Sequence, residues 1–146
     1  MPDILLVSDS EAVRDEVKAV VSDASTTFRE LTRGAEVRDA VKEKTPDLAV
    51  IDLQVGKMGG MATCLDLRLE EGAGRLPHVP VLMLLDRRAD VFLARRSQAE
   101  GWLVKPLDPF RLGRAVRHVL AGGTYEDGAY KPVTVVPRGA AAGSLQ

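Results

Sequence analysis

The most constraining feature of this chain is a short apolar run, residues 48–51, that ends in a carboxylate, Asp52. The run is rich in β-branched and aliphatic residues and bounded by polar ones, which favours a strand buried on both faces of a parallel sheet. Asp52 lies too far before Met61, where the next apolar pattern begins, to cap that helix. A carboxylate at this end of a parallel strand is instead placed for chemistry or metal binding.

Three further apolar runs share this design, and each is followed by a polar or charged side chain. They are residues 4–7 before Ser8 and Asp9, residues 80–85 before Asp86, and residues 101–104 before Lys105. A weaker strand is expected at residues 26–31, and amphipathic segments at helical spacing separate the strands. Five strands alternating with five helices predict an α/β fold, a flavodoxin-like doubly wound parallel sheet with strand order 2-1-3-4-5.

In that order the first and third strands are neighbours, so Asp9 and Asp52 should meet at the carboxyl edge, with Lys105 nearby on the fifth strand. Neighbouring carboxylates attract a hard cation such as Mg²⁺. A lysine can hold a phosphoryl oxygen as a point charge. The three residues together therefore indicate that Asp52 is a nucleophile that accepts a phosphoryl group.

These segments, in their order and spacing, resemble the receiver domain of bacterial two-component response regulators over about residues 3–121. The resemblance implies that Asp52 is the phosphoacceptor in a phosphorelay and that Asp9, Asp52 and the backbone carbonyl of Gln54 bind Mg²⁺. It also implies that Lys105 contacts the phosphoryl group and that the Lys105–Pro106 peptide bond is cis.

Four positions depart from the family pattern. Ser8 replaces one member of an acidic pair, which removes a charge from the metal pocket, although its hydroxyl could still assist through water. Leu85 stands at the switch position that usually carries Ser or Thr, and it cannot donate a hydrogen bond. Gly56 replaces a loop proline, and the aromatic switch position holds the bulkier Trp102. We therefore expect an atypical receiver with retained phosphoryl chemistry and impaired switching.

Two alternatives of other classes remain. One is a phosphorylation-independent pseudo-receiver that serves as a protein-interaction or dimerisation module. The other is a cofactor binder or small hydrolase on the same fold, which is disfavoured because no phosphate cradle follows the first strand and no Ser-His pair is suitably placed. We expect no enzymatic activity beyond Mg²⁺-dependent self-phosphorylation and dephosphorylation.

Composition limits the binding partners and the cellular compartment that we expect for this chain. The chain of 146 residues has a formal net charge of −1, which makes nucleic-acid binding unlikely. Its one cysteine, Cys64, excludes an intrachain disulfide, and we expect it to be packing. The lack of a secretion signal or a membrane span favours a cytoplasmic protein. Arginines around the fourth and fifth helices are interpreted as a solvated face or a partner surface.

The expected organisation is a receiver domain at residues 1–121 and a partly disordered tail at residues 122–146, with no output domain. Residues 131–136 could add one strand, and residues 138–146 are rich in Gly and Ala. Such a protein should act through other molecules. We expect a sensor histidine kinase or phosphotransfer protein, a separate effector, and a possible homodimer through helix four, strand five and helix five.

Overall fold

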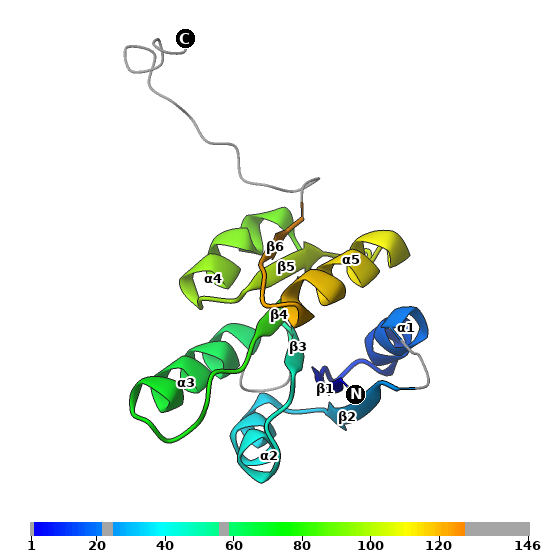
Figure 1. Cartoon of the computed structure of the whole chain (residues 1–146). Coiled ribbons are helices and arrows are strands. Elements are labelled where there is room, and N and C mark those ends of the chain that lie inside the picture. Colours follow the sequence, from blue (N-terminus) through cyan, green and yellow to red (C-terminus); the bar gives the residue numbers. More distant parts are fainter. Residues whose placement is uncertain (1, 22–24, 56–58, 128–146) are drawn as a thin grey trace, which may run out of the picture.

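The computed structural model describes residues 2–21, 25–55 and 59–127. Within these residues the chain forms a six-stranded sheet flanked by five α-helices (Figure 1). The elements in chain order are β1 (Asp3–Val7), α1 (Glu11–Val21), β2 (Thr27–Leu31), the 3-10 turn η1 (Gly34–Glu36), α2 (Val37–Glu43), β3 (Leu48–Asp52), α3 (Gly60–Gly72), β4 (Val81–Leu85), the 3-10 turn η2 (Arg88–Asp90), α4 (Val91–Arg96), β5 (Gly101–Val104), α5 (Pro109–Leu120) and β6 (Tyr125–Glu126).

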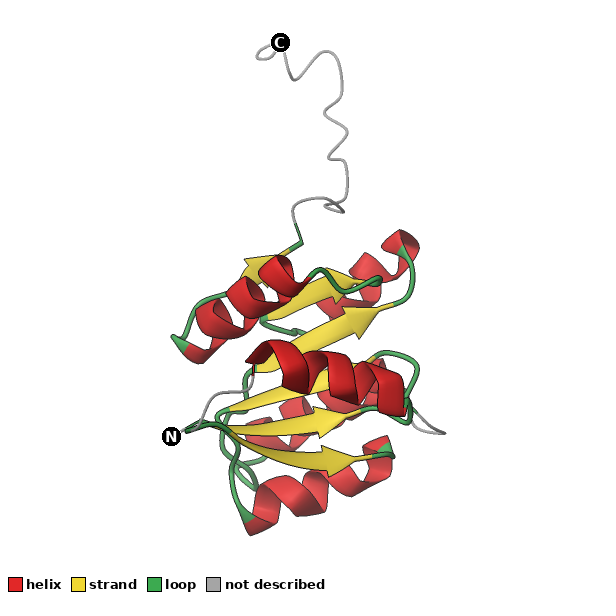
Figure 2. Cartoon of the chain, turned by 90° about the vertical axis from the view of Figure 1, so that its right-hand side faces the viewer, coloured by secondary structure: helices red, strands yellow, loops and turns green. Residues whose placement is uncertain are grey.

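Every strand runs parallel to its neighbours, in the order β2-β1-β3-β4-β5-β6. The α/β class and the order of the first five strands are as predicted from the sequence. Figure 2 shows the strands as one twisted layer between two layers of helices. The pairing of Val7 with Ile51 aligns the carboxyl ends of β1 and β3, so Ser8 and Asp52 come together at one edge of the sheet.

The strands β1, β3, β4 and β5 are buried on both faces, because their alternate residues point to opposite sides and helices cover each side. On one side α1 and α5 pack against a cluster that contains Ile4, Val50 and Leu84. On the other side the cluster contains Ile51 and Leu85 together with apolar residues of α2, α3 and α4. This two-sided core holds the strand ends, and with them the polar residues of the carboxyl edge, in fixed positions.

Local capping signals in the sequence define the starts of α1 and α5. The hydroxyl of Ser10 accepts a hydrogen bond from the Val13 amide at 3.3 Å, and the Asp108 carboxylate accepts one from the Phe110 amide at 2.8 Å. Both residues cap helices. The shortest described α-helix is α4, between β4 and β5. It ends at Arg96, and the chain turns at Gln98, which has a φ of +63°.

The main difference from the predicted fold is β6, which pairs with β5 at an edge of the sheet. The predicted tail includes residues 122–126, and the extra strand predicted at residues 131–136 lies outside the described residues, as do residues 138–146. Gly101 permits the pairing, because a Cβ atom there would lie 2.9 Å from the Tyr125 carbonyl oxygen. No described helix is both long and apolar enough to cross a membrane.

Candidate functional site

Asp52 lies at the centre of a polar cluster at the carboxyl edge, and only 2% of its surface is exposed. Lys105 Nζ donates a hydrogen bond to Asp52 Oδ1 at 2.9 Å. The Ser8 hydroxyl donates to Oδ2 at 2.9 Å, and the Gln54 amide donates to Oδ1 at 3.2 Å. Donors on both oxygens orient the carboxylate, and the ammonium partly neutralises its charge.

Ser8 is itself held in place by its neighbours. It is fully buried, its hydroxyl accepts a hydrogen bond from the Ser10 amide at 3.1 Å, and its carbonyl accepts one from Arg14 Nη1 at 2.7 Å. From the sequence, Ser8 is a lost acid whose hydroxyl could assist through water. The structure makes it a direct partner of Asp52.

Asp86 completes the cluster and was missed as a candidate in the sequence analysis. Lys105 Nζ also donates to Asp86 Oδ1 at 2.9 Å, so one ammonium bridges two carboxylates. Burial lowers the pKa of Lys105, but the hydrogen bonds and charges of Asp52 and Asp86 raise it by more, so the net shift is upward. The available signal was the position of Asp86 directly after β4, by the same rule that singled out Asp52.

The oxygen donors at this edge suit a hard cation. Asp9 directly follows Ser8 and is exposed, and the carboxylates of Asp52 and Asp86 share the Lys105 ammonium. Mg²⁺ prefers carboxylate and carbonyl oxygens and keeps several waters. The described residues contain no group of three or more His, Cys, Asp or Glu arranged to hold a metal. The oxygen ligands at this edge therefore match Mg²⁺ in kind but are few, and water would have to supply most of the ligands of a bound ion.

The two switch positions are both buried. Leu85 is fully buried in the core cluster, and its carbonyl accepts the Lys105 amide at 2.8 Å. The Trp102 ring is 3% exposed, and the Arg95 guanidinium lies over it at 5.3 Å from the ring centroid. The Lys105–Pro106 peptide bond is cis, as the resemblance implied. The loop position Gly56 lies outside the described residues.

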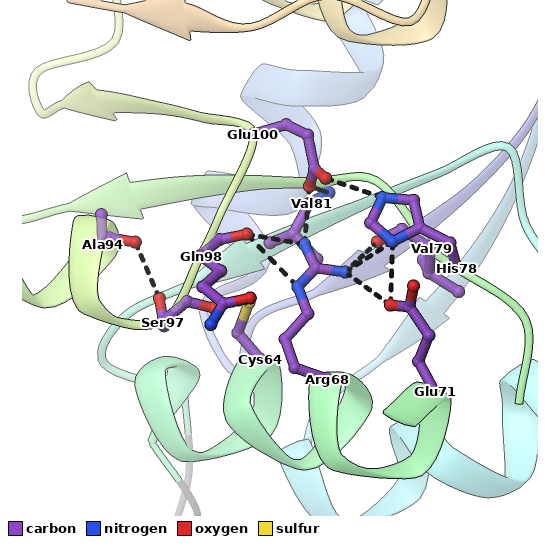
Figure 3. A network of polar contacts seen from close by, with 10 residues as sticks. All are labelled: Cys64, Arg68, Glu71, His78, Val79, Val81, Ala94, Ser97, Gln98 and Glu100. Atoms are coloured by element: carbon purple, nitrogen blue, oxygen red, sulfur yellow. Dashed lines mark hydrogen bonds and ion pairs between the residues drawn. The ribbon is translucent and has the colours of Figure 1, made fainter. Parts of the chain in front are cut away.

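A second polar cluster occupies the opposite, amino edge of β4 and β5 (Figure 3). Arg68 of α3 donates to Glu100 Oε1 at 2.6 Å and to the carbonyls of Val79 and Gln98 at 2.8 Å each. His78 contacts Glu100 Oε2 at 2.7 Å and Glu71 Oε1 at 2.9 Å. Arg68 thus joins α3 to the segments that precede β4 and β5.

Cys64 packs in the core, as predicted, and His118 contacts an aromatic ring. The Cys64 thiol is buried, donates to the Ser97 carbonyl at 3.2 Å, and has its pKa raised by burial. The His118 ring packs edge-on against Tyr125 at a centroid distance of 5.9 Å. Neither residue belongs to the cluster around Asp52.

Comparison with known proteins identifies the family. Residues 4–117 match the response regulator receiver domain, so the chain belongs to this family. The nitrate/nitrite response regulator protein NarL of Escherichia coli K12 is 30% identical over 132 residues, which cover 89% of this chain and 60% of NarL. The chain spans about half to three fifths of the length of such relatives.

Solved structures agree with this assignment. The crystal structure of a LuxR-family two-component response regulator from Aurantimonas sp. superposes with a TM-score of 0.77 at 25% identity, covering 89% of this chain and 92% of that chain. The chemotaxis response regulator CheY4 of Vibrio cholerae superposes with a TM-score of 0.71 at 25% identity, covering 82% and 98%. The chain is thus a signalling domain of the two-component type.

Proposed function

We propose that this protein receives a phosphoryl group on Asp52 in phosphorelay signalling and acts through protein–protein interaction. The observation that carries the proposal is the 2.9 Å contact between Lys105 Nζ and a nearly buried carboxylate at the carboxyl edge of the sheet. A buried carboxylate oriented by an ammonium, a hydroxyl and an amide is arranged as a nucleophile rather than as a solvated surface charge.

In the proposed reaction an oxygen of Asp52 attacks the phosphorus of a phosphodonor. An O–P bond forms while the bond from phosphorus to the leaving group breaks, and the leaving group departs with that electron pair. The product is an acyl phosphate on Asp52. Lys105 offsets the charge of the phosphoryl oxygens, and Ser8 holds the carboxylate orientation.

Mg²⁺ would be held by the carboxylates of Asp9 and Asp52, the backbone carbonyl of Gln54 and waters, with Ser8 close by. When bound, the ion would shield the negative charges of the acceptor and the incoming phosphoryl group. With serine in place of a second acid beside Asp9, we expect weaker binding than a pocket with one more carboxylate would give.

Intact-mass spectrometry of the full chain after incubation with acetyl phosphate and Mg²⁺ tests this proposal. Wild type should gain one phosphoryl group, whereas Asp52→Asn should gain none. Asp39→Asn is the matched control, because it removes an exposed carboxylate of α2 and should leave the reaction unchanged. Equal addition to wild type and Asp52→Asn would show that another group accepts the phosphoryl.

The second candidate is a pseudo-receiver that binds partners without phosphorylation. Two observations favour it: Leu85 is fully buried in the core where a switching hydroxyl would be needed, and the Ser8 hydroxyl already bonds Asp52. Absence of any phosphoryl addition, together with absence of Mg²⁺ binding by calorimetry, would favour this function over the first.

Partners follow from the proposed chemistry. A histidine kinase or a phosphotransfer protein would supply the phosphoryl group, and an effector or a second copy would read the result. We place the protein in the cytoplasm, where a free, buried thiol such as that of Cys64 persists. The exposed arginines of α4 and α5 are suited to an acidic partner.

A further inference from the structure

The Lys105 ammonium does not bind Asp52 alone, because it also holds an acidic side chain nearer the solvent. Nζ donates to Asp52 Oδ1 and to Asp86 Oδ1, at 2.9 Å each. The side chains of Asp52, Lys105 and Asp86 are 3%, 22% and 34% exposed, so the series runs from a buried acid through the ammonium to an outer acid. The group of this series that solvent reaches most easily is therefore a carboxylate.

The backbone fixes Asp86 beside Lys105. Leu85 at the end of β4 pairs with Val104 at the end of β5, and the Lys105 amide donates to the Leu85 carbonyl at 2.8 Å. Asp86 and Lys105 are the residues that directly follow these two paired strand ends. Their ion pair is thus built on the rigid part of the sheet, and the outer carboxylate has a defined position next to the site.

The cation that Asp86 contacts is Lys105 rather than the arginine next to it in sequence. Arg87 donates to Asp90 Oδ1 at 2.9 Å, and its pKa is raised mainly by Asp90, with a smaller contribution from the charge of Asp86. Two carboxylates consequently share the Lys105 ammonium. A phosphoryl group that arrives at Asp52 brings further negative charge to a cation that Asp86 already engages.

Small phosphodonors differ in the charge that they bring to such a site. In transfer from acetyl phosphate, an oxygen of Asp52 bonds to phosphorus while the bond from phosphorus to the acetate oxygen breaks, and acetate leaves with that electron pair as an anion. In transfer from phosphoramidate the phosphorus–nitrogen bond breaks, and the protonated nitrogen leaves with the electron pair as neutral ammonia. Phosphoramidate is therefore the less negative donor, and its cationic nitrogen can face a carboxylate.

We propose that Asp86 is a specificity-determining residue, which makes the Asp52 site discriminate against acyl phosphates and in favour of phosphoramidates. Its charge repels the more negative donor, and its contact with Lys105 competes for the ammonium that the phosphoryl oxygens need. This inference rests on the proposed phosphoryl transfer to Asp52 and specifies the class of donor that the site accepts.

Single-turnover rates with acetyl phosphate and with phosphoramidate, at one fixed Mg²⁺ concentration and read by intact mass of the full chain, test the proposal. Asp86→Asn keeps the shape of the side chain and removes its charge. The rate with acetyl phosphate should rise about fivefold, while the rate with phosphoramidate should change by less than about twofold. Added salt should reduce this difference between the variant and wild type, because it screens exposed charges.

Two further variants control for charge and for position. Asp86→Glu keeps the negative charge at the site and should retain most of the wild-type preference for phosphoramidate. Glu43→Gln removes the same charge from an exposed position at the end of α2, and it should leave the ratio of the two rates unchanged.

A purely structural role of Asp86 predicts a different result. If its carboxylate served to hold Lys105 in place, Asp86→Asn would slow transfer from both donors in the same proportion. An unchanged ratio of rates would therefore overturn the proposal. The ratio is a suitable readout because altered Mg²⁺ affinity or altered Lys105 orientation affects both donors alike.

Binding of inorganic phosphate, followed by NMR at the Ser8 and Lys105 amides, separates this proposal from phosphorylation itself. Asp86→Asn should bind phosphate about fivefold more tightly than wild type, because a repelling charge is lost. Tighter binding without phosphorylation of any protein would contradict the proposed function and support charge selection by Asp86. Phosphorylation of Asp52 with an unchanged ratio of rates would support the proposed function and overturn this inference. Unchanged phosphate affinity without phosphorylation would overturn both.

Discussion

Two polar clusters lie at opposite edges of the same sheet and use their charges differently. At the carboxyl edge, Lys105 bridges the carboxylates of Asp52 and Asp86. At the amino edge, Arg68 bridges Glu100 and the backbone carbonyls of Val79 and Gln98 (Figure 3). Each cation binds groups from other segments of the chain, but the two cations bind different kinds of group.

The difference lies in what each cation contacts. Arg68 distributes its planar donors over backbone carbonyls and a carboxylate, an arrangement that fixes segments relative to one another. Lys105 makes point contacts with two carboxylates, one of them nearly buried, so acidic groups exceed basic ones. The amino edge therefore stabilises the fold, whereas the carboxyl edge presents carboxylate oxygens, which the proposed phosphoryl acceptor and cation site require.

The largest expected effect comes from Arg68→Ala. Removing one partner of a mostly buried, hydrogen-bonded ion pair should lower the free energy of unfolding by about 3 kcal/mol, measured by urea denaturation. The phosphoryl addition by the folded protein should not change. Arg75→Ala is the control, because Arg75 pairs with Glu70 with 63% of its side chain exposed, and it should leave the free energy of unfolding nearly unchanged. A loss of phosphoryl addition in Arg68→Ala would remove the distinction between the clusters.

Lys105→Gln should lower the rate of phosphoryl transfer to Asp52 more than it lowers the free energy of unfolding. Loss of one charged donor from a transferring group typically lowers the rate about 100-fold, and rapid-quench measurements of phosphoryl incorporation would show it. Lys18→Gln, which alters a lysine paired with Glu30 on the side of α1, is the control. A rate within threefold of wild type would contradict the role of Lys105 at the phosphoryl group.

The smallest expected effect is a dependence of stability on alkaline pH. The folded-state pKa of Lys105 is raised above its ordinary value of 10.5. Its ion pairs therefore contribute stability that is fully present below pH 10.5 and lost as the pH rises through the folded-state pKa. Urea unfolding at a series of pH values should show a steeper alkaline decline for wild type than for Lys105→Met. Parallel declines would mean that Lys105 contributes no such linkage.

The features that could be predicted from the sequence are local ones. The apolar runs and the caps Ser10 and Asp108 predict the elements, since periodicity and capping are local properties. The same runs place Asp52 and Lys105 at one edge, because parallel strands share their carboxyl end. The sequence shows that Ser8 lacks a carboxylate. Its hydrogen bond to Asp52 could not be predicted, because it depends on the register of β1 against β3.

Pairings between distant segments were not predictable. Residues 125–127 carry no strand pattern of their own, and β6 exists because Gly101 admits a close backbone and Arg95 and Arg111 meet two acids. The partners of Arg68 include two backbone carbonyls, which no side-chain motif identifies. Such contacts depend on how loops fold back over the sheet, and the sequence pattern does not encode that path locally.

The sequence by itself determined the α/β class, the order of the five main strands and the edge that carries Asp52, because hydrophobic periodicity and parallel topology leave few arrangements open. The tertiary structure decided that Ser8 and Asp86 join the cluster, that Arg68 closes the opposite edge, and that β6 covers β5. The physical reason is that strand patterns are local, whereas hydrogen-bond and ion-pair partners are chosen by proximity in space.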